Sequence, residues 1–130
     1  MNREIKFRGK TLSGNWIYGL LTILTKDIDY NRKRGVYISN SLGLPFAYDV
    51  RPESVGQYIG LKDKNGIDIY EGDKFKIKAG SCYIHVYVCF VDGAFVFKDI
   101  ANNKTLYNLI DLHEMKIEGN IHKNEYLFDK

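Results

Sequence analysis

The chain has 130 residues, 45% hydrophobic and 27% charged, which is the balance of a globular domain that buries a core and excludes an intrinsically disordered segment. No stretch reaches the roughly 20 apolar residues of a membrane helix, and no apolar run of signal-peptide length follows the charged start, so we expect a soluble, intracellular protein with no membrane partner. The net charge of +3 is uneven, because residues 1–53 hold nine Lys or Arg against five Asp or Glu (+4) and residues 54–130 hold ten against eleven (−1).

The residue types favour strands over helices. Ten Tyr, seven Phe and 12 Gly against two Pro are typical of strands joined by glycine turns. We therefore expect a mainly β fold with at most one short helix. Cys82 and Cys89 lie seven positions apart in one predicted strand. Their side chains should fall on opposite faces and stay unpaired, which fits a reducing compartment.

Residues 1–53 are expected to form an N-terminal β lobe. Residues 4–8 alternate apolar and charged side chains as a half-buried strand does, and a turn follows at Ser13 and Gly14. The apolar run Trp16–Leu24 is too long for an exposed strand, so we expect it to be covered on both faces. Gly19 within it marks a bulge or a close backbone approach.

The charged stretch 25–35 has the character of an exposed hairpin loop. Short strands are predicted at residues 36–39 and 46–50. Pro52 then holds Arg51 outside the helical region, because its ring crowds the preceding residue.

Residues 54–130 are expected to form the second part, and the whole chain one compact unit. A strand is predicted at residues 54–59, and Asn65 with Gly66 predicts a hairpin with a type I′ turn. In residues 74–78, Phe75 and Ile77 alternate with lysines, which predicts a half-exposed strand.

Asp92 and Gly93 stand between two β-rich runs and predict a second two-residue hairpin. The register that follows pairs Val91 with Ala94, Phe90 with Phe95, Cys89 with Val96 and Val88 with Phe97. Both faces of the hairpin are then apolar near the turn, so neither face should be exposed to solvent. Further along, apolar spacing predicts one short helix in residues 104–113, a strand in 115–121 and a brief pairing in 126–130.

The segment ESVGQYIGLKDKNGIDIYEGD, from Glu53 to Asp73, resembles the central signature of the YopX family of phage and prophage proteins. The opening REIKFRG, the later GAFVFKD and the closing IEGNIHKN are similar to the family in the same order, from Arg3 to Asn124. Gly9 departs from the aromatic residue that the family more often has. The resemblance implies a phage or prophage product acting in the bacterial cytoplasm, with a β-rich fold ending in an SH3-like β-barrel. It implies no activity and no catalytic residue.

The polar residues form no recognisable catalytic or metal motif. His85, His113 and His122 lack metal-ligand spacing, and the cluster of His113 with Asp111 and Glu114 is better explained as ordinary surface polarity. The signature glycines lack phosphate-loop spacing. The carboxylates Asp63, Asp68 and Asp73 do not follow a calcium loop. We expect no catalytic residue, metal or cofactor.

Two readings of function remain. The first is a noncatalytic binding or adaptor protein that contacts an unidentified phage or host protein and self-associates as a homo-oligomer through the Trp16–Leu24 run and the hairpin of residues 86–97. A monomer whose N-terminal strands cover that hairpin is the alternative. The second reading is a nucleic-acid-binding β-barrel, in which lysines interleave with Tyr70 and Phe75. Its candidate surface is Arg32, Lys33, Arg34, Lys74, Lys76 and Lys78, with Arg3, Lys6, Arg8 and Lys10 as a further basic run. Solvated surface charge is the plainer account of these runs.

Overall fold

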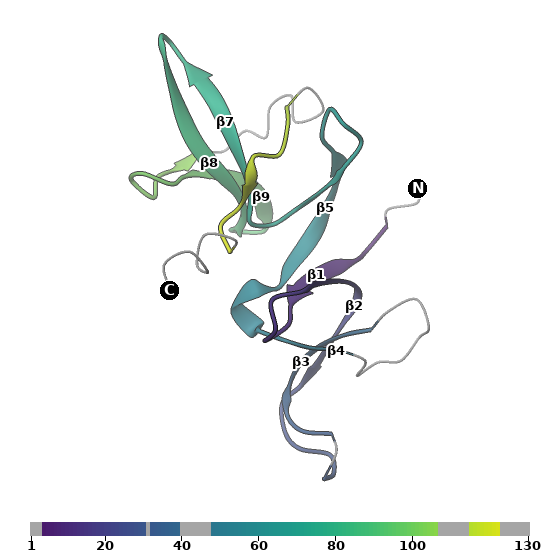
Figure 1. The fold of residues 1–130 in the computed structure, drawn as a ribbon. Coiled ribbons are helices and arrows are strands. Elements are labelled where there is room, and N and C mark those ends of the chain that lie inside the picture. The colour runs from purple at the N-terminus through teal and green to yellow at the C-terminus, as the bar shows by residue number, and fades with distance from the viewer. Residues whose placement is uncertain (1–3, 31, 40–47, 107–114, 123–130) are drawn as a thin grey trace. The chain divides into compact units, whose positions relative to one another are not determined.

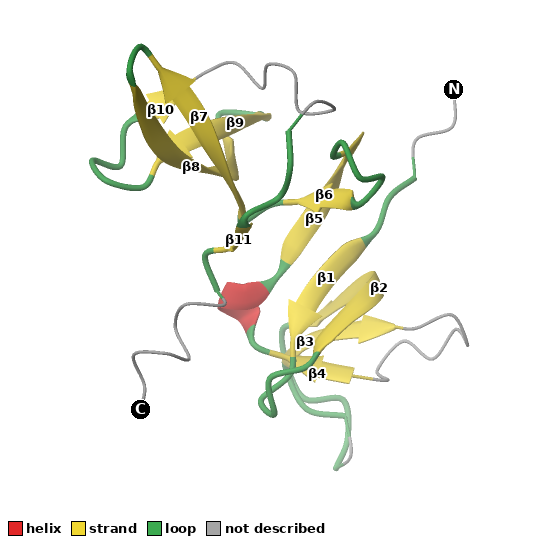
Figure 2. Ribbon diagram, turned by 45° about the horizontal axis from the view of Figure 1, so that its top comes forward, coloured by secondary structure: helices red, strands yellow, loops and turns green. Residues whose placement is uncertain are grey.

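The fold, a computed structural model, describes residues 4–30, 32–39, 48–106 and 115–122. The chain divides into two compact units, Met1–Tyr58 and Ile59–Lys130. Both consist of antiparallel strands, so the expectation of a mainly β fold is confirmed (Figures 1 and 2). The helical element among the described residues is one 3-10 turn at Pro52–Ser54, drawn in red in Figure 2. None of the described helical residues forms a segment long and apolar enough to cross a membrane.

The first unit is a sheet whose strands follow the order β4-β3-β2-β1-β5. Its strands are β1 (Phe7–Lys10), β2 (Trp16–Leu24), β3 (Gly35–Ser39), β4 (Tyr48–Val50) and the start of β5 (Gly56–Lys62), which continues into the second unit. The predicted second strand and the charged hairpin loop after it are confirmed. The first strand starts later than predicted. Arg51 is extended, with ψ at 125°, as the following proline requires.

Close backbone packing at Gly19 confirms the expectation for this glycine. A Cβ atom there would lie 1.8 Å from the carbonyl oxygen of Ser39 on β3. The expectation that both faces of β2 are covered is wrong, however. Tyr18, Leu20 and Ile23 are 51%, 59% and 61% exposed. The reason is that the buried core of this unit forms on β3 and β4, around Ile38 and Val50.

The second unit is an open sheet with the strand order β10-β9-β8-β7-β11. Its strands are β7 (Asp73–Ala79), β8 (Cys82–Val91), β9 (Ala94–Asp99), β10 (Thr105–Leu106) and β11 (Gly119–Asn120). Before them, β5 pairs with β6 (Asp68–Tyr70). Within the described ranges β10 and β11 are the two edges and do not pair with each other, so an SH3-like barrel is not confirmed.

The hairpin at Asp92 and Gly93 forms as predicted. Both residues have positive φ angles, 50° and 85°, as a type I′ turn requires. The β8–β9 register matches the predicted one pair by pair, including Val88 with Phe97. The expectation that neither face of the hairpin is exposed to solvent is wrong at Phe90. This residue is 54% exposed, although its ring packs edge-on against Phe95 with 5.0 Å between the ring centres.

The hairpin at Asn65 and Gly66 forms with a different turn. Only Gly66 has a positive φ, 79°, and its N–H donates to the carbonyl oxygen of Asp63 at 3.0 Å. This is the pattern of a type I turn followed by a left-handed glycine, not of type I′. The Oδ1 atom of Asp63 accepts the N–H groups of Asn65 and Ile67, which stabilises the type I form.

The structure describes only part of the C-terminal region for which elements were predicted. Thr105–Leu106 is a strand where the helix of residues 104–113 was expected to begin, because these two residues pair with Phe97 and Lys98 of β9. Residues 107–113 and 126–130 lie outside the described ranges. Of the predicted strand 115–121, the structure forms only Gly119–Asn120.

One face of the second sheet carries most of the core, and Val96 is buried on the other. Ile69, Phe75, Val86, Val88 and Phe97 are buried together, and Phe75 meets Phe97 edge-on at 5.9 Å. Because side chains alternate along a strand, the neighbours of these residues point to the opposite face.

Candidate nucleic-acid interface

Lysines occupy every second position of β7, on the face opposite the core. Lys74, Lys76 and Lys78 stand across from Tyr87, His85 and Tyr83 of β8, in that order. Directly paired residues share a face. The alternation of Phe75 and Ile77 toward the core therefore turns all three predicted lysines to the same side.

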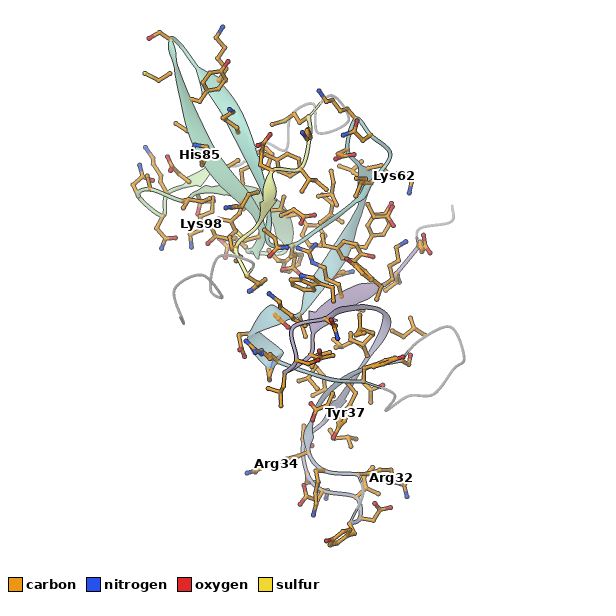
Figure 3. The ribbon with its side chains drawn as sticks, in the orientation of Figure 1. Arg32, Arg34, Tyr37, Lys62, His85 and Lys98 are labelled. Atoms are coloured by element: carbon orange, nitrogen blue, oxygen red, sulfur yellow. The ribbon has the colours of Figure 1, made fainter. Side chains whose placement is uncertain are left out.

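The next strand extends this surface. Tyr87 also pairs with Lys98 of β9, so a fourth lysine joins the same face. Figure 3 labels His85 on β8 and Lys98 on β9. We call this surface the lysine face and define it as Lys74, Lys76, Lys78, Tyr83, His85, Tyr87 and Lys98.

The lysine face is accessible where its aromatic and basic groups meet. Lys76, Lys78 and His85 are exposed, and Tyr83 is 57% exposed. The Nζ atom of Lys76 lies 5.0 Å from the ring centre of Tyr83, within cation–π range. Alternate residues of a strand are about 6.7 Å apart, so the lysines form a regular row of charges along β7.

Three acidic groups of the second unit have other partners or are buried. Asp63 and Asp73 are buried, and Asp68 forms an ion pair with Lys62. Within the described part of the chain, no carboxylate lies at ion-pairing distance from any lysine of the lysine face. The lysines of this face are therefore not held in ion pairs by described carboxylates, although residues 54–130 carry −1 overall.

The other predicted basic cluster lies in the first unit, in the loop between β2 and β3. Figure 3 shows Arg32 and Arg34 on opposite sides of this loop. Arg32 forms a salt bridge with Asp29, whose hydrogen bond and charge raise the pKa of the guanidinium. Lys33 lies 3.7 Å from the carboxylate of Asp27. These charges are largely balanced within the loop.

The basic residues of β1 are not a surface patch. Arg8 and Lys10 are 5% and 4% exposed and lie 4.7 Å and 5.4 Å from the ring centre of Trp16. Lys6 lies 4.7 Å from the ring centre of Tyr58 and 3.3 Å from the carboxylate of Glu4. This run stabilises the first sheet through cation–π contacts. Arg3 lies outside the described ranges.

The acidic residues of the signature segment support the fold. The Oδ2 atom of Asp73 accepts the N–H of Tyr70 at 2.8 Å, which closes the turn between β6 and β7. At this turn Gly72 donates its N–H to the carbonyl oxygen of Val88 at 2.7 Å. No group of three or more potential metal ligands occurs among the described residues. Asp111, His113 and Glu114 lie outside them, and His122 follows β11.

Sequence reasoning missed four members of the lysine face, namely Tyr83, His85, Tyr87 and Lys98. The signal for two of them was present, because the predicted pairing of Val88 with Phe97 also places Tyr87 across from Lys98. Tyr83 and His85 required the β7–β8 register. That register depends on the turn at Gly80, where φ is 66°.

These observations define a two-unit antiparallel β protein with a lysine-rich, aromatic sheet face. The chain belongs to the YopX protein family, whose sequence profile it matches over residues 6–129. It is also similar in fold to protein EF1440 from Enterococcus faecalis, known from a crystal structure. The TM-score is 0.57 with 23% sequence identity, covering 97% of this chain and 99% of that one. A search of curated protein sequences finds no significant match.

Proposed function

We propose that this protein is a noncatalytic nucleic-acid-binding protein of a phage or prophage, acting in the cytoplasm of the bacterial host through the lysine face. The observation that carries the proposal is the set of pairs Lys74–Tyr87, Lys76–His85 and Lys78–Tyr83 on one side of the sheet. Lysines neutralise phosphates, and exposed rings stack on bases, so the two groups together suit a polynucleotide better than an isolated anion.

The alternative basic cluster is a weaker candidate. Arg32 and Lys33 already have carboxylate partners in Asp29 and Asp27, which a phosphate would have to displace. The lysines of β7 form no ion pair with a described carboxylate. Nucleic-acid binding should therefore depend mainly on the second unit.

Two double variants with the same change in charge separate the two surfaces. We expect Lys76→Glu/Lys78→Glu to abolish binding of a labelled oligonucleotide in fluorescence anisotropy at low salt. Arg32→Glu/Lys33→Glu should weaken binding far less. The wild-type affinity should fall steeply with salt, and each lysine that no longer neutralises a phosphate should reduce the slope of log K against log salt by about 0.7 for a single strand. A flat salt response, or equal losses in both variants, would contradict the assignment.

A second candidate function is self-association, which would make the protein a homo-oligomeric adaptor for a phage or host protein. The specific observation is the exposure of Tyr18 and Leu20, which lie two positions apart and therefore on the same face of β2. Two exposed apolar side chains side by side on one face favour burial against another copy. The two candidate functions use different units and are compatible with each other.

A further inference from the structure

A groove of about 460 Å³ opens on the second unit and shares residues with the lysine face. From that face come Lys74, Tyr83 and His85. The remaining lining comes from Ile84, from Asp99 at the end of β9, and from Ile100 and Ala101 after it. Its volume falls within the range of about 300–1,000 Å³ of small-molecule sites.

The rim of the groove is preformed by hydrogen bonds. The N–H of Ile100 donates to the carbonyl oxygen of His85 at 2.9 Å, which fixes the segment after β9 beside β8. The N–H of Ala101 donates to Oδ1 of Asp99 at 2.9 Å, and Asp99 donates its own N–H to the carbonyl oxygen of Lys104 at 2.8 Å. A ligand would therefore meet an ordered edge and lose little affinity to ordering it.

The lining combines flat apolar surface with few polar groups. Ile100 is 43% exposed, and the ring of Tyr83 is 57% exposed. The polar residues of the lining are Lys74, His85 and Asp99. A nucleobase has apolar faces and a polar edge, so it matches this combination.

Asp99 supplies a preference among bases. Its Oδ1 atom is engaged by Ala101, whereas Oδ2 has no hydrogen-bond partner among the described residues. An ionised carboxylate accepts hydrogen bonds and donates none, so it favours an exocyclic amino group such as that of cytosine over the carbonyl of thymine.

We propose that this groove binds one unpaired base of single-stranded nucleic acid, preferentially one with an exocyclic amino group. The inference rests on the proposed function, because the lysines beside the groove would hold the adjoining phosphates. A duplex cannot satisfy the groove, since its bases are stacked and their pairing edges are occupied. The protein should therefore prefer single strands to duplexes.

The test compares labelled strands of about ten nucleotides, the scale of single-strand sites. The strands are oligo-dC, oligo-dT, an abasic strand with the same phosphates, and a duplex. We expect oligo-dC to bind the full-length chain about tenfold more tightly than the abasic strand. It should also bind about fivefold more tightly than oligo-dT. Asp99→Asn keeps the oxygen that accepts the Ala101 N–H and should remove the preference for dC.

Variants of the groove provide the controls. Ala101→Trp should fill the groove and reduce the oligo-dC affinity to that of the abasic strand, whereas Ala94→Trp, at an exposed alanine outside the groove lining, should leave it unchanged. If Ala101→Trp fails to fold, Tyr83→Ala should give the same loss and Tyr83→Phe should not.

The outcomes separate the groove from the lysine face. If oligo-dC and the abasic strand bind equally and both depend on salt, the groove does not bind a base, but the proposed nucleic-acid binding by the lysine face stands. Binding of oligo-dT as tight as oligo-dC would overturn the amino-group preference. Absence of binding by every strand at low salt would overturn both the groove and the proposed function.

Discussion

The Oδ2 atom of Asp63 accepts a hydrogen bond from the backbone N–H of Ile117 at 3.2 Å, across 54 positions of the sequence. Its Oδ1 atom accepts the N–H groups of Asn65 at 2.8 Å and Ile67 at 3.0 Å. One carboxylate, only 5% exposed as a residue, thus holds the β5–β6 turn and joins it to the segment before β11. The role of Asp63 in the segment Glu53–Asp73 is therefore structural.

Replacing this carboxylate should destabilise the protein. Asp63→Ala leaves three backbone N–H groups without their acceptor, and a single buried donor left unsatisfied costs about 1–3 kcal/mol. We expect a loss of at least that size in the free energy of unfolding, measured by urea denaturation at pH 7. Asp68→Asn is the matched control, because it removes a surface ion pair with Lys62 worth about 0–1 kcal/mol. Equal losses in the two variants would refute the structural role of Asp63.

The same carboxylate should make stability depend on pH. Burial pushes the pKa of Asp63 upward, but the N–H donors of Ile67, Ile117 and Asn65, with the charge of Lys64, lower it below its ordinary value. A folded pKa below the unfolded one contributes stability that is present above the unfolded pKa and is lost as the pH falls through the folded pKa. The difference in unfolding free energy between wild type and Asp63→Asn should therefore be largest near pH 7 and shrink below about pH 4. A difference independent of pH would contradict this.

The two hairpins show what local sequence determines. Asp92 and Gly93 predict both turn type and register, because the turn is set by the residues that occupy it and the flanking strands are regular. At Asn65 and Gly66 the same rule predicts a hairpin but the wrong turn. The reason is that Asp63, two positions earlier, offers its carboxylate to the backbone and also reaches Ile117, a partner that no local pattern indicates.

Gly19 should tolerate no side chain. A Cβ atom would lie 1.8 Å from the Ser39 carbonyl oxygen, and that atom is backbone, so β2 and β3 would have to separate. We expect Gly19→Ala to cost more than about 3 kcal/mol in unfolding free energy. Gly93 is the comparison, since nothing lies within 4 Å of its added Cβ and only the φ of +85° opposes a side chain. Gly93→Ala or Gly93→Val should cost about 1–3 kcal/mol. If thermal melts show a smaller loss of stability for Gly19→Ala than for Gly93→Ala, the β2–β3 contact is not as close as described.

The two free cysteines should differ in reactivity. Cys82 is exposed and Cys89 is half-buried. Burial raises the pKa of the Cys89 thiol, Lys98 opposes this and Glu71 adds to it, so the reactive thiolate is less populated. Iodoacetamide at pH 8, followed by mass spectrometry, should modify Cys82 first and Cys89 slowly. In Cys82→Ser the fast modification should disappear, and a Cys89 that reacts as fast as Cys82 would contradict its burial.

The sequence predicts the three lysines of the lysine face on β7, but not the residues that β8 and β9 add to it. Alternation along residues 74–78 is a local pattern, and it correctly turns Lys74, Lys76 and Lys78 to one side. The groove was out of reach of sequence reasoning, since it depends on the chain after β9 returning beside β8 through the Ile100–His85 hydrogen bond. The prediction of a basic surface at residues 32–34 did not foresee that Asp29 pairs with Arg32 and Asp27 with Lys33, because these pairs depend on how the loop folds.

Self-association through β2 is the last prediction. Leu20 is 59% exposed and shares its face of β2 with the exposed Tyr18, so a lysine there would put a charge on that apolar surface. If copies pair through β2, light scattering at micromolar concentration should give a multiple of 15.0 kDa for the wild type, and Leu20→Lys should lower it to that of one chain. Ile28→Lys is the control, because Ile28 is 54% exposed but lies in the loop after β2, and it should leave the assembly intact. A wild-type mass of 15.0 kDa would exclude the homo-oligomer at that concentration, and an assembly that persists in Leu20→Lys would exclude β2 as its interface.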